Sequence, residues 1–227
     1  MCGRFALTES PERLAERFML ASAQLDVSPS WNIAPSSGIF TITADEQSQR
    51  HLRTMHWGLL PSWAKDPTIG NKLINARGET VAEKPSFRSA FKSHRCIIPA
   101  SGFYEWKTER GVKYPWYISL KSGEPMAFAG LWETWHPKAG ETAESCCIIT
   151  TGANELMQQI HDRMPVVLDP EQWEAWLSPK ERQVDHLLPM IHPHEADSMQ
   201  AWPVTKELNK VGVRNDAGLV ERISSLI

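Results

Sequence analysis

Short β-rich runs, each ended by turn residues, follow one another along most of this chain of 227 residues. Runs rich in β-branched and aromatic residues favour strands, and their close spacing predicts a sheet-based core with little room for long helices. The chain is long enough, at 41% hydrophobic residues, to bury one sizeable core. It holds no apolar run of about 18 residues, so we expect no membrane span. The clearest strands are predicted at residues 39–43, 51–57, 114–120, 126–132 and 146–151.

The predicted helices are few and start with clear capping signals. Ser10 followed by Pro11 predicts a helix that runs to about Leu20, with Leu14, Phe18 and Ala21 on one stripe. Residues 32–35 and the Trp63-bearing stretch 58–68 are predicted as turn and loop. Without repeats or a low-complexity linker, the pattern predicts a single α+β domain over residues 1–227. Further helices are predicted at residues 154–159, 170–176 and 179–187.

Cys2 stands directly behind the initiator Met1. Aminopeptidases remove Met1 when the next side chain is small, which would leave an α-amine and a thiol on the same residue. Reference pKa values of about 7.7–8.0 for the amine and about 8.5 for the thiol allow both groups to react near neutral pH. A cysteine at position two can also occur without any function, so whether Cys2 is reactive has to be judged from the rest of the sequence.

The remaining cysteines, Cys96, Cys146 and Cys147, form no CxxC pair or other zinc spacing. They are most simply read as core residues, and the His-Pro-His stretch at 192–194 as a polar loop without a third ligand. We therefore expect no metal and no cofactor. The chain start lacks a basic region followed by an apolar stretch, so we expect no signal peptide and a reducing, cytoplasmic setting.

Charge is unevenly distributed along the chain. The net charge is −3, but residues 65–113 carry ten Lys or Arg against five Asp or Glu, which is +5 and leaves −8 elsewhere. A local basic face can follow a phosphate backbone, and the ten tryptophans of the chain could stack on unpaired bases. An uneven solvated surface and tryptophans buried in a core are equally ordinary explanations.

The polar residues that could carry chemistry are scattered over Cys2, Asn75, Glu105 and His161. Taken alone, each has a simpler explanation. Asn75 could be a turn residue, Glu105 a surface residue on a sheet, and His161 a surface residue or a hydrogen-bonded core residue. Because alternate residues of a strand share a side, some pairs are expected to face the same way. These same-side pairs are Cys2 with Arg4 (opposite Phe5), Asn75 with Arg77 (opposite Ile74 and Ala76), Phe103 with Glu105 (opposite Tyr104 and Trp106), and His161 with Arg163 (opposite Asp162).

Six motifs resemble, in the same order, those of the SOS-response-associated peptidase (SRAP) family, whose members shield abasic sites in single-stranded DNA. The match spans residues 2 to about 204. The resemblance implies a mostly antiparallel, barrel-like β core with peripheral helices. The motifs are MCGRF at 1–5, NIAP at 32–35, WGLLPSW at 57–63, INARGET at 74–80, GFYEW at 102–106 and IHDRMP at 160–165.

The resemblance also implies a reaction. The Cys2 amine attacks the aldehyde of a ring-opened abasic sugar to give a Schiff base, and the thiol then closes a thiazolidine ring. Glu105 matches the acid/base position, His161 the residue that handles the sugar ring oxygen, and Asn75 the residue that orients Cys2.

The partner implied by the resemblance is single-stranded DNA containing abasic sites. Arg4, Arg77 and Arg163 would hold phosphates beside the lesion, and Trp63 would stack against unpaired bases. We expect a monomeric enzyme of the SOS response and DNA repair, located in the cytoplasm and on the nucleoid when bound to DNA. We also expect the protein to remove its own Met1, which is a peptidase activity, and to have lyase activity.

Two other classes stay open on the sequence alone. N-terminal nucleophile glutaminases also begin Met-Cys-Gly and attack an amide with the same cysteine, but they usually carry a fused synthase domain, for which 227 residues leave little room. The second alternative is a non-covalent single-strand binding module in which Cys2 is incidental.

Overall fold

A seven-stranded sheet contains a closed ring of five strands. The computed structural model describes residues 2–22, 26–136, 141–209 and 214–224. The strands of this sheet are β3 (Gly38–Ala44), β4 (Arg50–Trp57), β5 (Asn75–Arg77), β6 (Arg95–Ala100), β9 (Met126–Trp135), β10 (Ala143–Gly152) and β11 (Arg163–Pro165). They follow the order β11-β10-β4-β3-β6-β9, β5 also pairs with β10, and pairing of β9 with β10 closes the ring. Among the strand pairs of the described residues, β10–β4 and β10–β5 are parallel and the others are antiparallel, so the expected mostly antiparallel, barrel-like core is confirmed.

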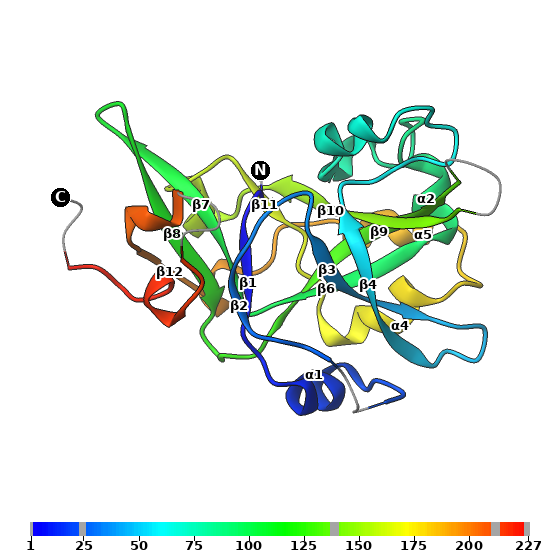
Figure 1. Ribbon diagram of the computed structural model, residues 1–227, viewed down its shortest axis with the longest axis horizontal. Coiled ribbons are helices and arrows are strands. Elements are labelled where there is room, and N and C mark those ends of the chain that lie inside the picture. The colour runs from blue at the N-terminus through cyan, green and yellow to red at the C-terminus, as the bar shows by residue number, and fades with distance from the viewer. Residues whose placement is uncertain (1, 23–25, 137–140, 210–213, 225–227) are drawn as a thin grey trace.

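A second, five-stranded sheet has the order β12-β8-β7-β1-β2. Its strands are β1 (Phe5–Leu7), β2 (Ser30–Ile33), β7 (Gly102–Glu109), β8 (Val112–Leu120) and β12 (Met199–Pro203). Strand β1 lies between β2 and β7, with Phe5 opposite both Ile33 and Phe103. In Figure 1 the N-terminal end of the chain therefore lies between the β7–β8 hairpin and the segment that follows β4.

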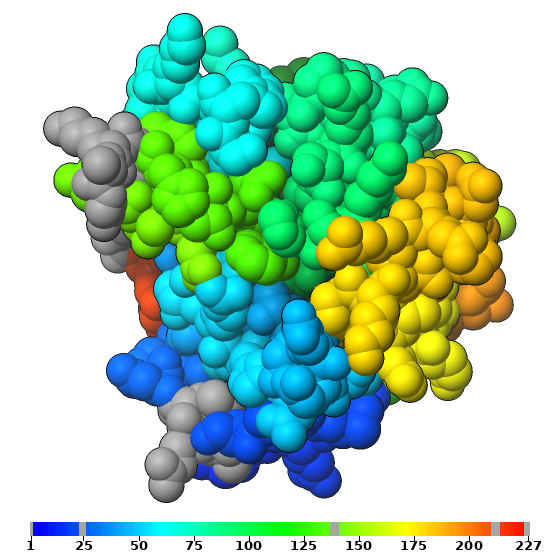
Figure 2. Space-filling model, turned by 90° about the vertical axis from the view of Figure 1, so that its right-hand side faces the viewer, coloured from blue at the N-terminus to red at the C-terminus, as the bar shows by residue number. Residues whose placement is uncertain are grey.

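The helices are short and lie around the sheets (Figure 1). They are α1 (Pro11–Phe18), α2 (Arg88–Ser93), α3 (Glu155–Gln158), α4 (Trp173–Leu177) and α5 (Val184–Leu187). The 3-10 helices are η1 (Pro67–Lys72), η2 (Gly78–Thr80), η3 (Pro170–Gln172), η4 (Leu188–Met190), η5 (Ala196–Ser198), η6 (Lys206–Asn209) and η7 (Ala217–Leu219). Figure 2 shows the face on which the segment after η3, in yellow, lies beside the green segment that contains α2. Among the described residues, no helix has the length and apolar character needed to cross a membrane.

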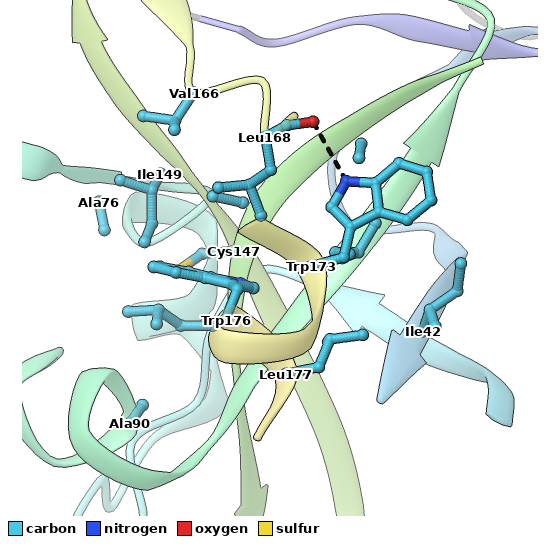
Figure 3. Packing of buried hydrophobic residues seen from close by; sticks show 14 of the residues in the cluster. Ile42, Ala76, Ala90, Cys147, Ile149, Val166, Leu168, Trp173, Trp176 and Leu177 are labelled. Carbon is cyan, nitrogen blue, oxygen red and sulfur yellow. Dashed lines mark hydrogen bonds between the residues drawn. The ribbon is translucent and has the colours of Figure 1, made fainter. Parts of the chain in front are cut away.

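Helix α4 supplies two tryptophans to the larger buried cluster (Figure 3). The indole N–H of Trp173 donates to the carbonyl of Leu168 at 3.1 Å, and that of Trp176 donates to the carbonyl of Cys96 at 2.9 Å. A buried indole needs such a partner, because an unpaired N–H in the core costs free energy. For these two residues the core explanation of the high tryptophan content is correct.

A second buried cluster surrounds the start of the chain. It contains Cys2 and Phe5, and the Phe5 ring meets Trp57 edge-on with ring centroids 5.2 Å apart. The Trp57 indole in turn donates to the carbonyl of Ile74 at 3.0 Å, next to Asn75. Aromatic packing therefore fixes the chain start against the entry into β5.

Arg95 shows that the basic segment 65–113 is not one surface. Its side chain is buried, and its guanidinium donates to four carbonyls, those of Phe91, Trp176, Ser178 and Glu181. Burial lowers the pKa of Arg95 to about 10. The two ends of the segment also lie on opposite sides of the molecule in Figure 1, at η1 and on the β7–β8 hairpin.

Helix α1 begins as predicted and ends earlier. The Ser10 side chain accepts the N–H of Arg13 at 3.3 Å, and Leu14 and Phe18 are buried. Met19 then adopts a left-handed conformation with φ 51°, which ends the helix. The placement of Ala21 on the buried stripe is therefore wrong, and its side chain is exposed.

Two other segments differ from the predicted secondary structure because their backbone groups form hydrogen bonds with distant residues. Residues 32 and 33 belong to β2 rather than to a turn, since they pair with β1. The helix predicted at 179–187 forms only over Val184–Leu187. The carbonyls of Ser178 and Glu181 accept from Arg95, so they are occupied where a longer helix would need them.

Candidate active site

Asn75 and Cys2 are in direct contact although they are 73 positions apart. The Asn75 side-chain amide donates to the carbonyl of Cys2 at 2.8 Å, while the backbone of Asn75 pairs with Ile148 on β10. Cys2 is fully buried. The Asn75 Oδ1 atom is also buried and has no hydrogen-bond partner among the described residues. It is therefore an acceptor beside Cys2 that can receive a donor.

Glu105 brings a carboxyl group into the same buried region. It lies on β7, is only 3% exposed, and burial raises its pKa, which the nearby His161 partly offsets. Burial and the Glu105 charge together raise the pKa of the Cys2 thiol, while a hydrogen bond from the Arg4 backbone acts in the opposite sense. The thiol is therefore protonated at neutral pH, and a base is needed when it reacts.

His161 faces Glu105 from the turn that follows α3. Its Nε2 is 4.0 Å from Glu105 Oε2. Its Nδ1 accepts the backbone N–H of Arg163 at 3.0 Å and lies 2.8 Å from Asp162 Oδ1. The two contacts of Nδ1 ask for different protonation states, since accepting the N–H needs a bare nitrogen and bonding to the Asp162 carboxylate needs a proton there. The carboxyl group and the imidazole are therefore neighbours, at a separation longer than a direct hydrogen bond.

Strand alternation is correct for β7 and wrong for the chain start. Phe103 belongs to the cluster that contains Cys2, and Tyr104 belongs to a different cluster, as expected for opposite sides of β7. Phe5, however, shares the cluster of Cys2, because β1 begins only at Phe5 and the residues before it do not alternate as a strand.

Arg4 points away from this corner. Its guanidinium donates to the Asn32 side chain and to the carbonyl of Leu208 at 3.2 Å, and the residue is 8% exposed. Its role as a phosphate contact stays a prediction, and in this conformation at least two of its donors are used within the protein.

Arg77 and Arg163 approach each other across β10. Thr150 of β10 pairs with Arg77 on one side and with Pro165 of β11 on the other. Arg77 is exposed. The Arg163 guanidinium binds the carboxylate of Glu79 and the carbonyl and hydroxyl of Thr150. Sequence reasoning did not assign a role to Glu79, since nothing local links two residues 84 positions apart.

Trp63 lies outside the buried corner, on the loop predicted for it. Its side chain is 56% exposed. It lines a cavity of about 460 Å³ together with Lys65, Ile69 and Lys72. The lining combines an aromatic face and two cations with one carboxylate, that of Asp66.

The described residues contain no group of three or more side chains arranged to hold a metal ion. His194 Nδ1 lies 3.5 Å from Asp169 Oδ1, and His192 Nδ1 contacts the carbonyl of Pro193 at 3.0 Å. The four cysteines are all free and buried.

The family model described as SOS response associated peptidase (SRAP) matches residues 1–211. The chain belongs to the SRAP family. Its SRAP relatives include the abasic site processing protein YoqW of Bacillus subtilis, 47% identical over 92% of this chain and 94% of that protein. They also include HMCES of Xenopus tropicalis, 33% identical over 92% of this chain and 75% of that protein, and YedK of Escherichia coli, 33% identical over 78% and 79%. Both are likewise called abasic site processing proteins.

Solved structures agree with this SRAP assignment of the fold. A protein of Bacteroides thetaiotaomicron has a TM-score of 0.88 at 29% identity, covering 98% of this chain and all of its own. A protein of Bordetella bronchiseptica has a TM-score of 0.77 at 25% identity, covering 90% of this chain and all of its own.

Proposed function

We propose that this protein processes abasic sites in single-stranded DNA by forming a thiazolidine between Cys2 and the ring-opened sugar aldehyde. The observation that carries the proposal is that buried Cys2 has the half-buried Asn75 and the buried Glu105 as neighbours, with the Asn75 amide bonded to the Cys2 carbonyl at 2.8 Å and the Glu105 charge acting on the Cys2 thiol. Relatives up to 47% identical are named abasic site processing proteins, which supports the same substrate class.

The reaction requires that Met1, which lies outside the described residues, has been removed. The free Cys2 amine adds to the aldehyde carbon, and loss of one water gives an imine. The thiol sulfur then bonds to the imine carbon while its proton ends on the ring nitrogen. The sum is aminothiol plus aldehyde to thiazolidine plus water, with no oxidant or reductant.

The protein side chains move the protons of this sequence. Glu105, in its ionised form, accepts a proton from the attacking amine and returns one to the departing hydroxyl. His161, with Nε2 toward Glu105, serves the sugar ring oxygen during ring opening. The buried Asn75 Oδ1 offers the acceptor that would orient the amine of the processed Cys2.

The raised pKa of the Cys2 thiol also fits this order of steps. A thiol that stays protonated does not compete with the amine for the aldehyde, and it adds only once the imine is formed. An amide-cleaving nucleophile would instead gain from a lowered thiol pKa. The raised pKa of the thiol is therefore in keeping with imine-first capture, and it does not favour the N-terminal nucleophile glutaminase alternative.

DNA would reach this corner past exposed basic and aromatic groups. Arg77 and Arg163 lie beside β10, close to Asn75 in β5, and we assign them the phosphates next to the lesion. Trp63 would hold an unpaired base by stacking. Arg4 is the fourth residue assigned to DNA. Removal of Met1 by the same site, and any lyase activity, belong to this proposal as accompanying activities.

Intact mass measurement tests the proposal. The protein is incubated with a single-stranded oligonucleotide that carries one abasic site and, as control, with the undamaged strand. The expected adduct has the mass of the two components without Met1 and minus one water, survives heating, and is absent from the control. A protein that binds the strand and gives no adduct would instead be a non-covalent single-strand binding module. A protein that releases ammonia from glutamine would be an amidohydrolase.

A further inference from the structure

Arg163 already holds an anion in the free protein, the carboxylate of Glu79. Both terminal nitrogens of the guanidinium donate to this carboxylate, with Nη2 3.0 Å from Oε2. The partnership lowers the pKa of Glu79, so the carboxylate is ionised. The pair is a two-pronged contact of the kind that arginine makes equally with carboxylates and with phosphates.

The neighbouring Arg77 differs. Its side chain is exposed, and its charge acts on the Glu79 carboxylate more weakly than Arg163 does, as the causes of the lowered Glu79 pKa show. Arg163 is more enclosed, with 16% of its side chain exposed, and its Nε is buried without a partner among the described residues. A partly desolvated guanidinium gains more from an anion than an exposed one does.

Arg163 does not depend on Glu79 for its position. Its Nη2 also donates to the Thr150 carbonyl at 2.7 Å and to the Thr150 hydroxyl at 3.1 Å, both on the paired strand β10. Glu79, by contrast, lies on the short 3-10 helix η2 with 54% of its side chain exposed. The carboxylate can therefore turn into solvent while the guanidinium stays in place.

We propose that Glu79 is an internal competitor for DNA phosphate, which occupies the anion-binding fork of Arg163 until a phosphate displaces it. This rests on the proposed function, because it takes Arg163 to be a phosphate contact. The consequence is weaker non-covalent binding to any single strand. An undamaged strand is released more readily, whereas a strand with an abasic site is retained by its covalent bond.

The test measures affinity for an undamaged single-stranded oligonucleotide by fluorescence anisotropy at low salt. Glu79→Gln removes the charge and keeps a side chain of the same size. Glu83→Gln is the matched control, since Glu83 is an exposed carboxylate of the same segment without an ion pair among the described residues. We expect Glu79→Gln to raise the affinity about 1.5- to fivefold, the range that follows from the usual strength of a half-exposed ion pair, and Glu83→Gln to raise it less.

Arg163→Ala tests whether the gain in DNA affinity of Glu79→Gln depends on Arg163. If Glu79 competes at Arg163, the gain from Glu79→Gln disappears when both substitutions are combined. A gain that persists in the double variant would mean that the carboxylate repels DNA at long range, and would overturn the inference. A lower affinity of Glu79→Gln, with unchanged thermal unfolding, would overturn it as well, since Glu79 would then position Arg163.

Cross-linking separates this inference from the proposed function. Wild-type protein that forms the adduct while Glu79→Gln gains no affinity would overturn the inference alone. Wild-type protein that neither binds single strands nor forms the adduct would overturn both.

Discussion

The buried corner around Cys2 and the exposed rim around Arg77 differ in how far their side chains are exposed to water. Cys2 and Glu105 are almost completely removed from water, and burial shifts both proton equilibria. Arg77 and Trp63 are exposed, where charge attracts a polyanion and an aromatic face is open for stacking. We therefore expect the cross-linking rate, which we assign to the corner, to depend on pH and on single-atom substitutions. We expect the DNA affinity, which we assign to the rim, to depend on salt.

The largest expected effect is at Cys2. Cys2→Ser keeps the amine after Met1 removal and exchanges the thiol for a hydroxyl, so an imine can form but no stable ring. We expect complete loss of the heat-stable adduct in gel or mass analysis, with binding to undamaged strands unchanged. A Cys2→Ser adduct at wild-type yield would contradict thiazolidine formation.

The second largest effect is expected on the cross-linking rate when Glu105 is replaced and Cys2 is kept. Glu105→Gln removes the group to which we assign proton transfer, which should slow single-turnover cross-linking by about 10²–10⁴-fold, because this is the usual contribution of general acid–base catalysis. His161→Ala should slow the same reaction, again with little change in binding. Loss of binding and rate in equal proportion would instead point to a structural role.

The pH profile sharpens the assignment of Glu105. Burial disfavours the carboxylate, so its pKa lies above the ordinary value of 4.5. As the pH falls through this raised pKa the base becomes protonated, and the cross-linking rate of the wild-type protein should fall with it. This acid limb should disappear in Glu105→Gln. A profile that is identical in both proteins would show that another group is the base.

The third effect belongs to the rim. Trp63→Ala should weaken binding to undamaged single strands by about 1–3 kcal/mol, the usual size of a lost base–aromatic stack. The slope of log affinity against log salt should stay nearly unchanged, because stacking releases few ions. Titrations at several salt concentrations measure both quantities. A changed slope would mean that Trp63 mainly positions Lys65 or Lys72, which line the same cavity.

The smallest effect is expected for a single phosphate contact. Arg77→Ala should lower the salt slope by about 0.7, the value for one contact on a single strand. Lys113→Ala is the control, since Lys113 is also exposed and belongs to the basic segment but lies on the β7–β8 hairpin. Equal slope changes in both variants would show that DNA binding is spread over the surface and has no defined rim.

Local patterns in the sequence were sufficient for much of the fold. The Ser10–Pro11 start of α1 and the inward placement of Ala76 in β5 follow from capping and alternation, and the structure confirms both. These predictions succeeded because each depends on neighbours within one element. The end of α1 and the short α5 were not predictable in the same way, since distant contacts decided them. For α5, Arg95 occupies the carbonyls that a longer helix would use.

The sequence by itself determined the family, through six motifs in a fixed order, and the residue types available for the chemistry. Only the tertiary structure decided which of them meet. Asn75 reaches Cys2 over 73 positions and Glu79 reaches Arg163 over 84. Arg4, although two residues from Cys2, turns toward Asn32 instead. The physical reason is that strand pairing and side-chain packing across the sheets set these contacts, and both depend on residues far apart in the chain.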